Sequence, residues 1–296
     1  MRQAILITAY KNIEQLLEII NYFPSSFNFY VHADRRSLLE PKLIKVGRKN
    51  VHVYKKYLVN WGGYNHLQAI AFLAREALKE EGNGFFHLIS GQDFPIRPVN
   101  FFENHLDLSR DYLDFFPLPA ERWSGNGGLE RIQYFNFYDL INAKKNKRWI
   151  DELIKWQKLL GISRSLPSYF PQLYGGSTWW SLTRSTLQFA LEGSENNKKF
   201  FRRMRFTYCS EEIYFHTVIL NSTRYASNVI NDGLRYIDWE SGKGGYPAFL
   251  DETDFSIITS MGKIFARKFE PHILSRLKSY LSTHLPSTED RLKDAG

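Results

Sequence analysis

The 296-residue sequence contains one cysteine, Cys209, which excludes an internal disulfide framework and a zinc site built from cysteines. So little cysteine is typical of a reducing compartment, and we expect a cytoplasmic protein. Apolar runs stay well short of 18 residues, so no membrane-spanning helix is expected. The apolar stretch at the N-terminus is too short for a signal peptide and predicts a buried strand instead.

Several common motifs are also missing. The sequence has no P-loop, no G-x-G-x-x-G after a strand and no H-E-x-x-H. It lacks the Asp-x-Asp pair with which some enzymes hold a divalent metal against a diphosphate, and its nearest substitutes are Asp238-Trp-Glu240 and Glu252-Thr-Asp254. No metal is therefore expected, and a departing diphosphate would need Lys or Arg instead.

The charge and the aromatic content point to anionic, flat ligands. Lys and Arg outnumber Asp and Glu by 39 to 31, a net charge of +8, and aromatic residues make up 16% of the chain. Cations gather at 144–148 and at 198–205, the second group interleaved with Phe200 and Phe201. Solvated helix faces are the simplest interpretation of both clusters, and contact with an anionic membrane surface or polymer is the alternative.

Strand and helix patterns alternate along the first part of the chain, which predicts an α/β fold with a doubly wound, parallel sheet. Strands are expected at 4–8, 27–32, 51–53, 85–89, 111–116, 175–182 and 235–239. Helices are expected at 12–22, 38–46, 67–78, 147–160, 211–219 and 271–281. We expect one domain over 1–284 and a frayed, charged tail over 285–296.

Ligands of such a sheet bind beyond the carboxyl ends of its strands, where three candidates lie. Asp34 can accept a hydrogen bond from a base or a ribose, although an Asp that caps the next helix is an equal alternative. Trp61 precedes two glycines and can stack on a base, although a surface Trp in a turn is common. Asp93 is best explained by hydrogen bonds to its own turn.

Two later segments bring charge into apolar surroundings. Ser210 predicts the N-cap of a helix that opens with Glu211 and Glu212, whose side chains would then point in different directions. Arg267 and Lys268 stand between two phenylalanines. Cations among apolar neighbours require an anion, and a diphosphate would supply it.

Seven motifs in order, spread over about 5–269, carry a resemblance to a known family: VHAD, WGG, SGQDFPI, GGSTWWSLTR, SEEIYFHTVI, RYIDW and FARKF. They resemble the core-2/I-branching glycosyltransferases, which include β-1,6-N-acetylglucosaminyltransferases and peptide xylosyltransferases. The resemblance implies a GT-A-like fold with a Rossmann-like, mostly parallel sheet flanked by helices. It also implies metal independence and inversion at the anomeric carbon, and the missing secretory anchor suggests a bacterial-type member.

The resemblance also implies roles for individual residues. Glu212 matches the catalytic glutamate, and Lys268 matches a lysine that binds the diphosphate. Asp34 matches a uridine-binding aspartate, and Trp61 falls at an aromatic position near the uracil. Trp239 matches a tryptophan that contacts the acceptor.

The sequence departs from the family pattern at two positions. The second diphosphate cation of the family, an arginine, aligns near Gly245, so we expect Lys243 or Arg267 to substitute for it. The xylosyltransferases carry an aspartate where this chain has Thr178, which favours an N-acetylglucosaminyl donor. We group Thr178 and Asp93 with Trp239 as acceptor-binding candidates.

The expected activity is transfer of N-acetylglucosamine from a UDP-sugar to a hydroxyl of a glycan acceptor, with a β-linkage formed and no cofactor needed. Polysaccharide biosynthesis is the expected process, at the inner membrane face if the basic clusters bind it. The alternatives are an enzyme that uses UDP-xylose, an inactive carbohydrate-binding relative and a nucleic-acid-binding protein. Glu212 together with Lys268 argues against an inactive relative, and nucleic-acid motifs are missing, so no nucleic acid is expected as a partner.

Overall fold

The computed structural model describes residues 1–45 and 47–285, so the expected tail lies almost entirely outside the described residues. A seven-stranded sheet forms its centre, in the order β3-β2-β1-β4-β7-β6-β8. β7 is antiparallel to both neighbours and the other pairings are parallel, which confirms the expected mostly parallel sheet. The strands are β1 (Arg2–Ala9), β2 (Asn28–Ala33), β3 (Val51–Tyr54), β4 (Asn83–Ser90), β6 (Asp111–Pro117), β7 (Tyr174–Thr183) and β8 (Val229–Asn231).

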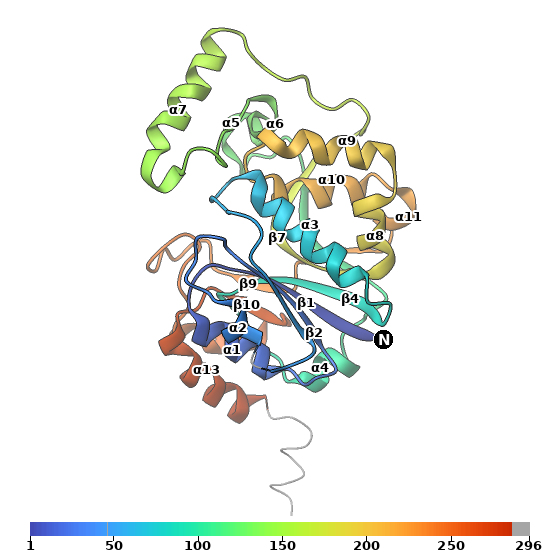
Figure 1. Cartoon of the computed structure of the whole chain (residues 1–296), viewed down its shortest axis with the longest axis vertical. Coiled ribbons are helices and arrows are strands. Elements are labelled where there is room, and N and C mark those ends of the chain that lie inside the picture. The colour runs from blue at the N-terminus through green and yellow to red at the C-terminus, as the bar shows by residue number, and fades with distance from the viewer. Residues whose placement is uncertain (46, 286–296) are drawn as a thin grey trace, which may run out of the picture.

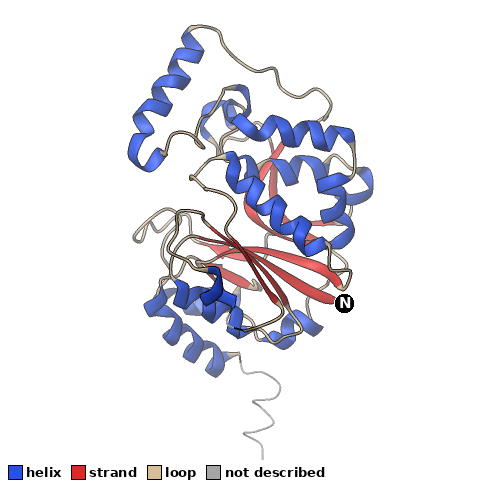
Figure 2. Cartoon of the chain, viewed as in Figure 1, coloured by secondary structure: helices blue, strands red, loops and turns tan. Residues whose placement is uncertain are grey.

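Helices cover both faces of this sheet (Figures 1 and 2), because its strands are apolar on both sides. Ile5 and Ile7 of β1 enter one core, and Ala4 and Leu6 enter the other. The first core is closed by α1 (Ile13–Tyr22), α2 (Pro41–Lys45), α4 (Val99–Asn104), α12 (Phe255–Ser260) and α13 (Pro271–His284). The second is closed by α3 (Tyr64–Leu78), α8 (Arg184–Glu192), α9 (Glu195–Arg203) and α10 (Tyr214–Leu220).

A small second sheet, in the order β5-β10-β9, docks the C-terminal segment against the loop after β4. Its strands are β5 (Asp93–Pro95), β9 (Arg235–Ile237) and β10 (Phe265–Arg267). The antiparallel register sets Arg267 opposite Asp93. The other elements are α5 (Ser124–Gly127), α6 (Glu130–Gln133), α7 (Ala143–Leu159), α11 (Thr223–Ala226) and the 3-10 turns η1 (Met204–Phe206), η2 (Ser210–Glu212) and η3 (Glu252–Asp254).

Most expected elements are confirmed, and two helices begin three residues after their expected starts. The helix expected at 38–46 is reduced to α2, which begins at Pro41, a residue suited to the first turn of a helix. The helix expected at 211–219 is wrong at its start, because η2 comes first and α10 begins at Tyr214. Ser210 does not cap it: its hydroxyl is buried without a hydrogen-bond partner. That the chain forms a single domain stays a prediction.

The basic cluster at 198–205 follows the simpler interpretation. Phe200 is fully buried in the second core, and Phe201 packs against that core. Arg202 pairs with Glu195 at 3.1 Å on the surface of α9. The aromatic residues of this cluster therefore stabilise the fold, and Lys198, Lys199 and Arg202 lie on a solvated helix face, whereas Arg203 is half-buried.

Two buried histidines make the stability of the fold depend on pH. Burial lowers the pKa of His32, at the end of β2, and of His216, in α10, from 6.5 to about 4. Between these values the unfolded chain binds more protons than the folded one, so the stabilisation is complete above pH 6.5 and declines as pH falls toward 4.

We therefore expect the free energy of unfolding, measured by urea denaturation between pH 7 and 5, to decrease with acidification. His216→Gln should flatten this slope by up to about 1.4 kcal/mol per pH unit, the contribution of one proton. His105→Gln, at an exposed position, is the control and should leave the slope unchanged. An unaltered slope in His216→Gln would show that the pKa of His216 is the same in the folded and the unfolded chain.

Candidate functional site

The loops at the carboxyl edge of the main sheet are joined by side chains from distant segments. His66, on α3, lies 3.4 Å from Thr8 Oγ1 at the end of β1 and 3.0 Å from Glu211 Oε1. The Tyr10 hydroxyl donates to Gln92 Oε1 at 3.3 Å, and the Phe269 amide donates to the Gln92 carbonyl at 3.0 Å. The acidic turn η2, the loops after β1 and β4 and the segment after β10 therefore form one site.

The two glutamates of η2 face different surroundings, as expected. Glu211 is buried, with His66 on one of its oxygens and no hydrogen-bond partner on the other. Glu212 keeps 27% of its side chain exposed, and its Oε2 accepts from Arg131 Nη1 at 2.7 Å. Glu212 is therefore the glutamate that a reactant can reach.

The surroundings of Glu212 bring its pKa close to neutral pH. Burial raises the pKa of Glu212 to about 7, the adjacent Arg131 opposes this shift, and the charge of Glu211 adds to it. The Arg131 guanidinium itself lies 3.6 Å from the centre of the Trp123 ring. A carboxylate with a pKa near the working pH suits general-base catalysis.

The Trp61-Gly62-Gly63 turn is hydrogen-bonded to the residue that precedes the acidic turn η2. Gly62 has a φ of 78°, and a Cβ there would lie 2.5 Å from the Tyr208 ring, so only glycine fits. The Gly62 carbonyl accepts from the Cys209 amide at 3.0 Å, directly before η2. Trp61 is 58% exposed and meets Tyr208 edge-on, which leaves its indole accessible to a flat ligand.

Asp34 organises two loops of the expected nucleotide side. Its carboxylate accepts from the Arg36 amide at 2.8 Å and from the Val59 amide at 2.6 Å. The alternative that Asp34 caps the next helix is wrong, because α2 begins only at Pro41. Contact between Asp34 and a nucleotide stays a prediction.

Three lysines converge on two aromatic rings beside this edge. Lys268 Nζ lies 4.1 Å and Lys11 Nζ 5.8 Å from the centre of the Phe249 ring. Lys144 Nζ lies 5.5 Å and Lys11 Nζ 5.9 Å from the centre of the Tyr10 ring. We call Lys11, Lys144 and Lys268 the lysine cluster. Sequence analysis missed Lys11, whose only signal is its place directly after the first strand.

The positive charge of the lysine cluster favours the binding of an anion. Burial lowers the pKa of Lys268, and Arg267, Lys11 and Lys144 lower it further by repulsion. Only Lys11 has a carboxylate within ion-pair distance among the described residues, Glu270 at 2.9 Å. A bound anion would relieve this excess of positive charge.

The structure contradicts the expected role of Lys243. Its ammonium group contacts Asp254 at 3.1 Å, Thr253 at 2.8 Å and Asp251 at 3.4 Å, so it is already neutralised. The position aligned with the family arginine does lie at the site, because a Cβ on Gly245 would be 3.0 Å from Lys268 Nζ.

Arg267 and Asp93 neutralise each other in the interior. Arg267 Nε lies 3.0 Å from Asp93 Oδ1, and its guanidinium lies 4.3 Å from the centre of the Trp179 ring. Asp93 is 0% exposed and also accepts from the Ser90 amide at 2.5 Å. The local interpretation of Asp93 is therefore confirmed, and direct contact with an acceptor is wrong because no ligand can reach it. Arg267 is engaged in the same way, so the structure argues against it as the second diphosphate ligand.

The other acceptor candidates differ in accessibility. Trp239 is 47% exposed, and its ring lies 4.9 Å from that of Tyr246, so the pair offers an aromatic surface to solvent. Thr178, in β7, is buried beside Trp179. Trp239 is thus open to a ligand, whereas Thr178 would need movement of its neighbours to meet one.

The carboxylates that come nearest to an Asp-x-Asp pair are engaged elsewhere. Glu252 pairs with Arg276, Asp254 with Lys243, and Asp238 accepts hydrogen bonds within its own turn. Within the described residues, no group of three or more His, Cys, Asp or Glu side chains could hold a metal ion. Metal independence itself stays a prediction.

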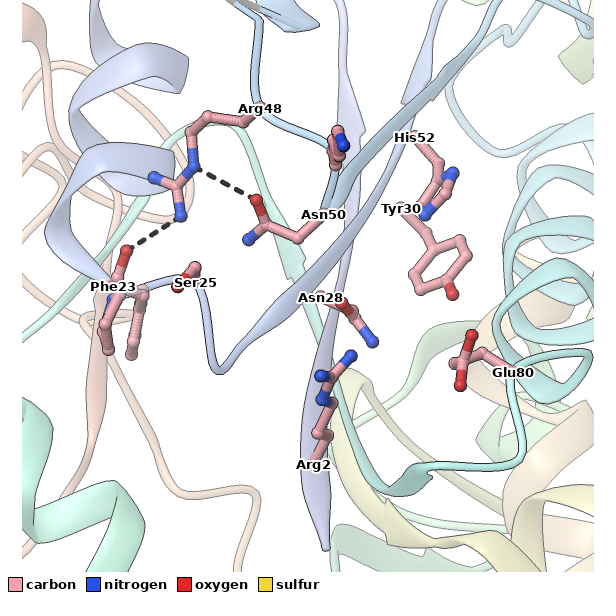
Figure 3. Close-up of a pocket in the computed structure, with 11 residues that line it drawn as sticks. Arg2, Phe23, Ser25, Asn28, Tyr30, Arg48, Asn50, His52 and Glu80 are labelled. Carbon is pink, nitrogen blue, oxygen red and sulfur yellow. Dashed lines mark hydrogen bonds between the residues drawn. The ribbon is translucent and has the colours of Figure 1, made fainter.

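A cavity of about 750 Å³ opens at the opposite, amino edge of the sheet (Figure 3). Arg48 extends along it and donates to the Phe23 carbonyl at 3.1 Å and to Asn50 Oδ1 at 3.3 Å. These bonds join α1 to the start of β3. None of the candidate residues lines this cavity, so it lies outside the site.

A family model and the relatives found by comparison with known proteins point to the same family. A family model described as Core-2/I-Branching enzyme matches residues 4–260. Beta-glucuronosyltransferase GlcAT14A from Arabidopsis thaliana is 26% identical over 292 residues, which cover 90% of this chain and 60% of the relative. Xylosyltransferase 2 from Homo sapiens is 26% identical over 301 residues, which cover 94% of this chain and 32% of the relative. The chain therefore spans less than two thirds of the length of these relatives.

A solved structure, core-mannan synthase A from Aspergillus fumigatus in a Mn/GDP form, is similar with a TM-score of 0.35 and 12% identity. The match covers 76% of this chain and 71% of that chain. A likeness this low carries no conclusion about a fold or a metal.

The pKa of Glu212 can be tested without knowledge of the substrate. In protein labelled with ¹³C at the glutamate carboxyls, the Glu212 resonance, assigned with Glu212→Gln, should titrate with a midpoint near 7. Arg131→Met should raise this midpoint, because it removes the cation that favours the carboxylate. Glu211→Gln should lower it, because it removes a repelling charge.

The matched control is Arg122→Met, which removes an exposed arginine stacked on Phe116 rather than on the acidic turn. It should leave the midpoint unchanged. Movement of the midpoint in the same direction in Arg131→Met and Glu211→Gln would contradict this electrostatic explanation.

Proposed function

Because the chain belongs to the core-2/I-branching enzyme family of glycosyltransferases, we propose that it is an inverting, metal-independent enzyme that transfers a sugar from a UDP-sugar to a glycan hydroxyl. The observation that carries this proposal is the meeting of two features at one edge of the sheet. Glu212 is an accessible carboxylate with a pKa near neutrality, and the lysine cluster at the same edge carries more positive than negative charge, since among the described residues only Lys11 is paired with a carboxylate.

In this mechanism Glu212 takes the proton of the acceptor hydroxyl. The acceptor oxygen forms a bond to the anomeric carbon from the face opposite UDP, and the bond from that carbon to the diphosphate oxygen breaks. The electron pair leaves with UDP, and an α-linked donor gives a β-linked product. Arg131, bonded to Glu212, keeps part of the base ionised at neutral pH.

The lysine cluster is proposed to hold the diphosphate. Lys268 and Lys11 are half-buried and Lys144 is exposed, and Lys11 and Lys144 take the place of the family arginine that Gly245 replaces. Charge on the leaving diphosphate grows in the transition state, so these lysines stabilise it more than the bound donor. Asp34 and Trp61 are proposed to contact the uridine, and Trp239 the acceptor.

N-acetylglucosamine is the sugar proposed, on the basis of Thr178 at the position where the xylosyltransferases have an aspartate. The names of the relatives favour a second candidate, because they describe xylosyl and glucuronosyl transfer. UDP-xylose and UDP-glucuronic acid are therefore the donors to compare with UDP-N-acetylglucosamine. A cytoplasmic location, with contact at an anionic membrane surface, is part of the same proposal.

The proposed base is tested by Glu212→Gln. We expect UDP release from one of the three donors, stimulated by a glycan acceptor, to fall by about 10²–10⁴-fold, with UDP affinity nearly intact. Glutamine keeps the shape of the side chain but cannot accept the proton. Equal turnover in Glu212→Gln and the unmodified protein would remove Glu212 as the base, and no release from any UDP-sugar would reject the proposed activity.

The lysine cluster is tested by calorimetry with UDP and uridine in the presence of EDTA. Lys268→Ala should weaken UDP binding by about tenfold to a hundredfold and leave uridine binding unchanged, because a charge-assisted hydrogen bond contributes about 1.5–3 kcal/mol. Lys144→Ala should weaken UDP binding less because Lys144 is exposed, and Lys11→Ala should weaken it less because Lys11 is already paired with Glu270.

Lys243→Ala is the matched control, because Lys243 carries the same charge but is neutralised by carboxylates. It should bind UDP like the unmodified protein. Loss of UDP binding in EDTA, restored by manganese, would show that a metal rather than the lysine cluster holds the diphosphate.

A further inference from the structure

Helix α7 projects from the body of the protein at the upper left of Figure 1 and leaves one face without protein contact. Its inner face is held by Gln157, whose side chain bonds both backbone groups of Phe135 at 2.7 and 3.0 Å, and by buried Ile150. The adjoining face, about a quarter turn around the helix, is unusual, because large apolar side chains are exposed there.

These side chains form a continuous stripe. Trp149 is 68% exposed, Leu153 37%, Trp156 57% and Leu160 66%. They stand at spacings of four, three and four residues, so they project from the same side of the helix over about three turns. We call these four residues the α7 stripe. Single exposed apolar residues are ordinary, but an aligned set of two tryptophans and two leucines marks an interaction surface.

Cations accompany the α7 stripe. The segment from 144 to 158 carries six Lys and Arg residues against two acidic ones. Lys147 pairs with Asp151, and Lys158 pairs with Glu130. Among the described residues, Lys145, Arg148 and Lys155 have no carboxylate within ion-pair distance, and Arg148 and Lys155 each directly precede a tryptophan of the stripe.

The neighbouring basic helix α9 shows that this arrangement is specific to α7. Both helices have Lys and Arg close to aromatic residues in sequence. In α9, Phe200 is fully buried and the cations alone face water. In α7 the aromatic residues face water together with the cations, so folding leaves the apolar side of the helix uncovered.

We propose that the α7 stripe docks the protein onto an anionic lipid bilayer, with α7 lying in the plane of the interface. Tryptophan is suited to the boundary between headgroups and acyl chains, because its ring is apolar and its N–H is polar. The unpaired cations favour anionic headgroups over zwitterionic ones. The helices of residues 1–45 and 47–285 all lack the length or the hydropathy to cross a bilayer, so this contact is peripheral.

A second copy of the chain is the main alternative occupant, and the charges argue against it. Two copies that meet through the stripe would bring Arg148 and Lys155 of each copy together with a single acid, Glu152, so an excess of like charge would remain at the contact. Anionic lipid supplies both the apolar depth and the opposite charge. Donor binding is not required for this contact, so the proposal can fail or hold independently of the proposed enzymatic activity.

The experiment is co-flotation of the full chain with vesicles of phosphatidylcholine alone or mixed with phosphatidylglycerol, at low and high salt. The protein should float with the mixed vesicles, less at high salt, and little with phosphatidylcholine. Trp149→Ser/Trp156→Ser should weaken binding at least tenfold. Arg148→Glu/Lys155→Glu should abolish the preference for phosphatidylglycerol.

Ile257→Ser/Met261→Ser is the matched control, since it removes two exposed apolar side chains of 45% and 48% exposure away from α7. It should float like the unmodified protein, and near-ultraviolet circular dichroism should show that all variants remain folded. Equal flotation of the tryptophan variant and the unmodified protein, or no flotation at all, would overturn the proposal. A dimer in light scattering that the tryptophan variant dissociates would assign the stripe to contact between copies instead.

Discussion

The buried ion pair between Asp93 and Arg267 is the contact on which the arrangement of the site depends. It joins β5, just after the central strand β4, to β10 near the end of the described chain. Loss of one partner of such a pair leaves an uncompensated charge in the interior and typically costs about 3–5 kcal/mol. Lys268 follows Arg267 directly, so the pair that stabilises the small sheet also positions the main cation of the lysine cluster.

This scaffold gives two adjacent glutamates different partners and different exposure to solvent. Both glutamates lie in the 3-10 turn η2, in which successive side chains point about 120° apart. Glu211 is fixed by His66 in the interior, whereas Glu212 lies between solvent and Arg131. The buried charge of the first glutamate raises the proton affinity of the second, so a structural residue tunes a reactive one.

The lysine cluster and the α7 stripe are linked through one helix. Lys144 lies in the first turn of α7, before a kink at Asn146, and its ammonium group lies beside Tyr10, while Trp149 and Trp156 lie beyond the kink and face outward. The basic residues at 144–148 thus divide between two surfaces. The fold thus divides one local run of positive charge into a part that faces the site and a part that faces away from it.

The sequence by itself determined six of the seven strands of the main sheet and the longer helices α1, α3, α7 and α13, because apolar spacing is a local property that each segment shows alone. It also singled out Glu212, Lys268 and Trp61 as candidates, which lie in contiguous motifs. Only the tertiary structure decided that Lys243 is neutralised by Asp254 and that Asp93 forms a buried ion pair with Arg267. It alone also places Lys11 and Lys144 beside the same ring, that of Tyr10. These outcomes depend on contacts between segments far apart in the chain, and the availability of a charged group is set by such partners rather than by its own sequence neighbours.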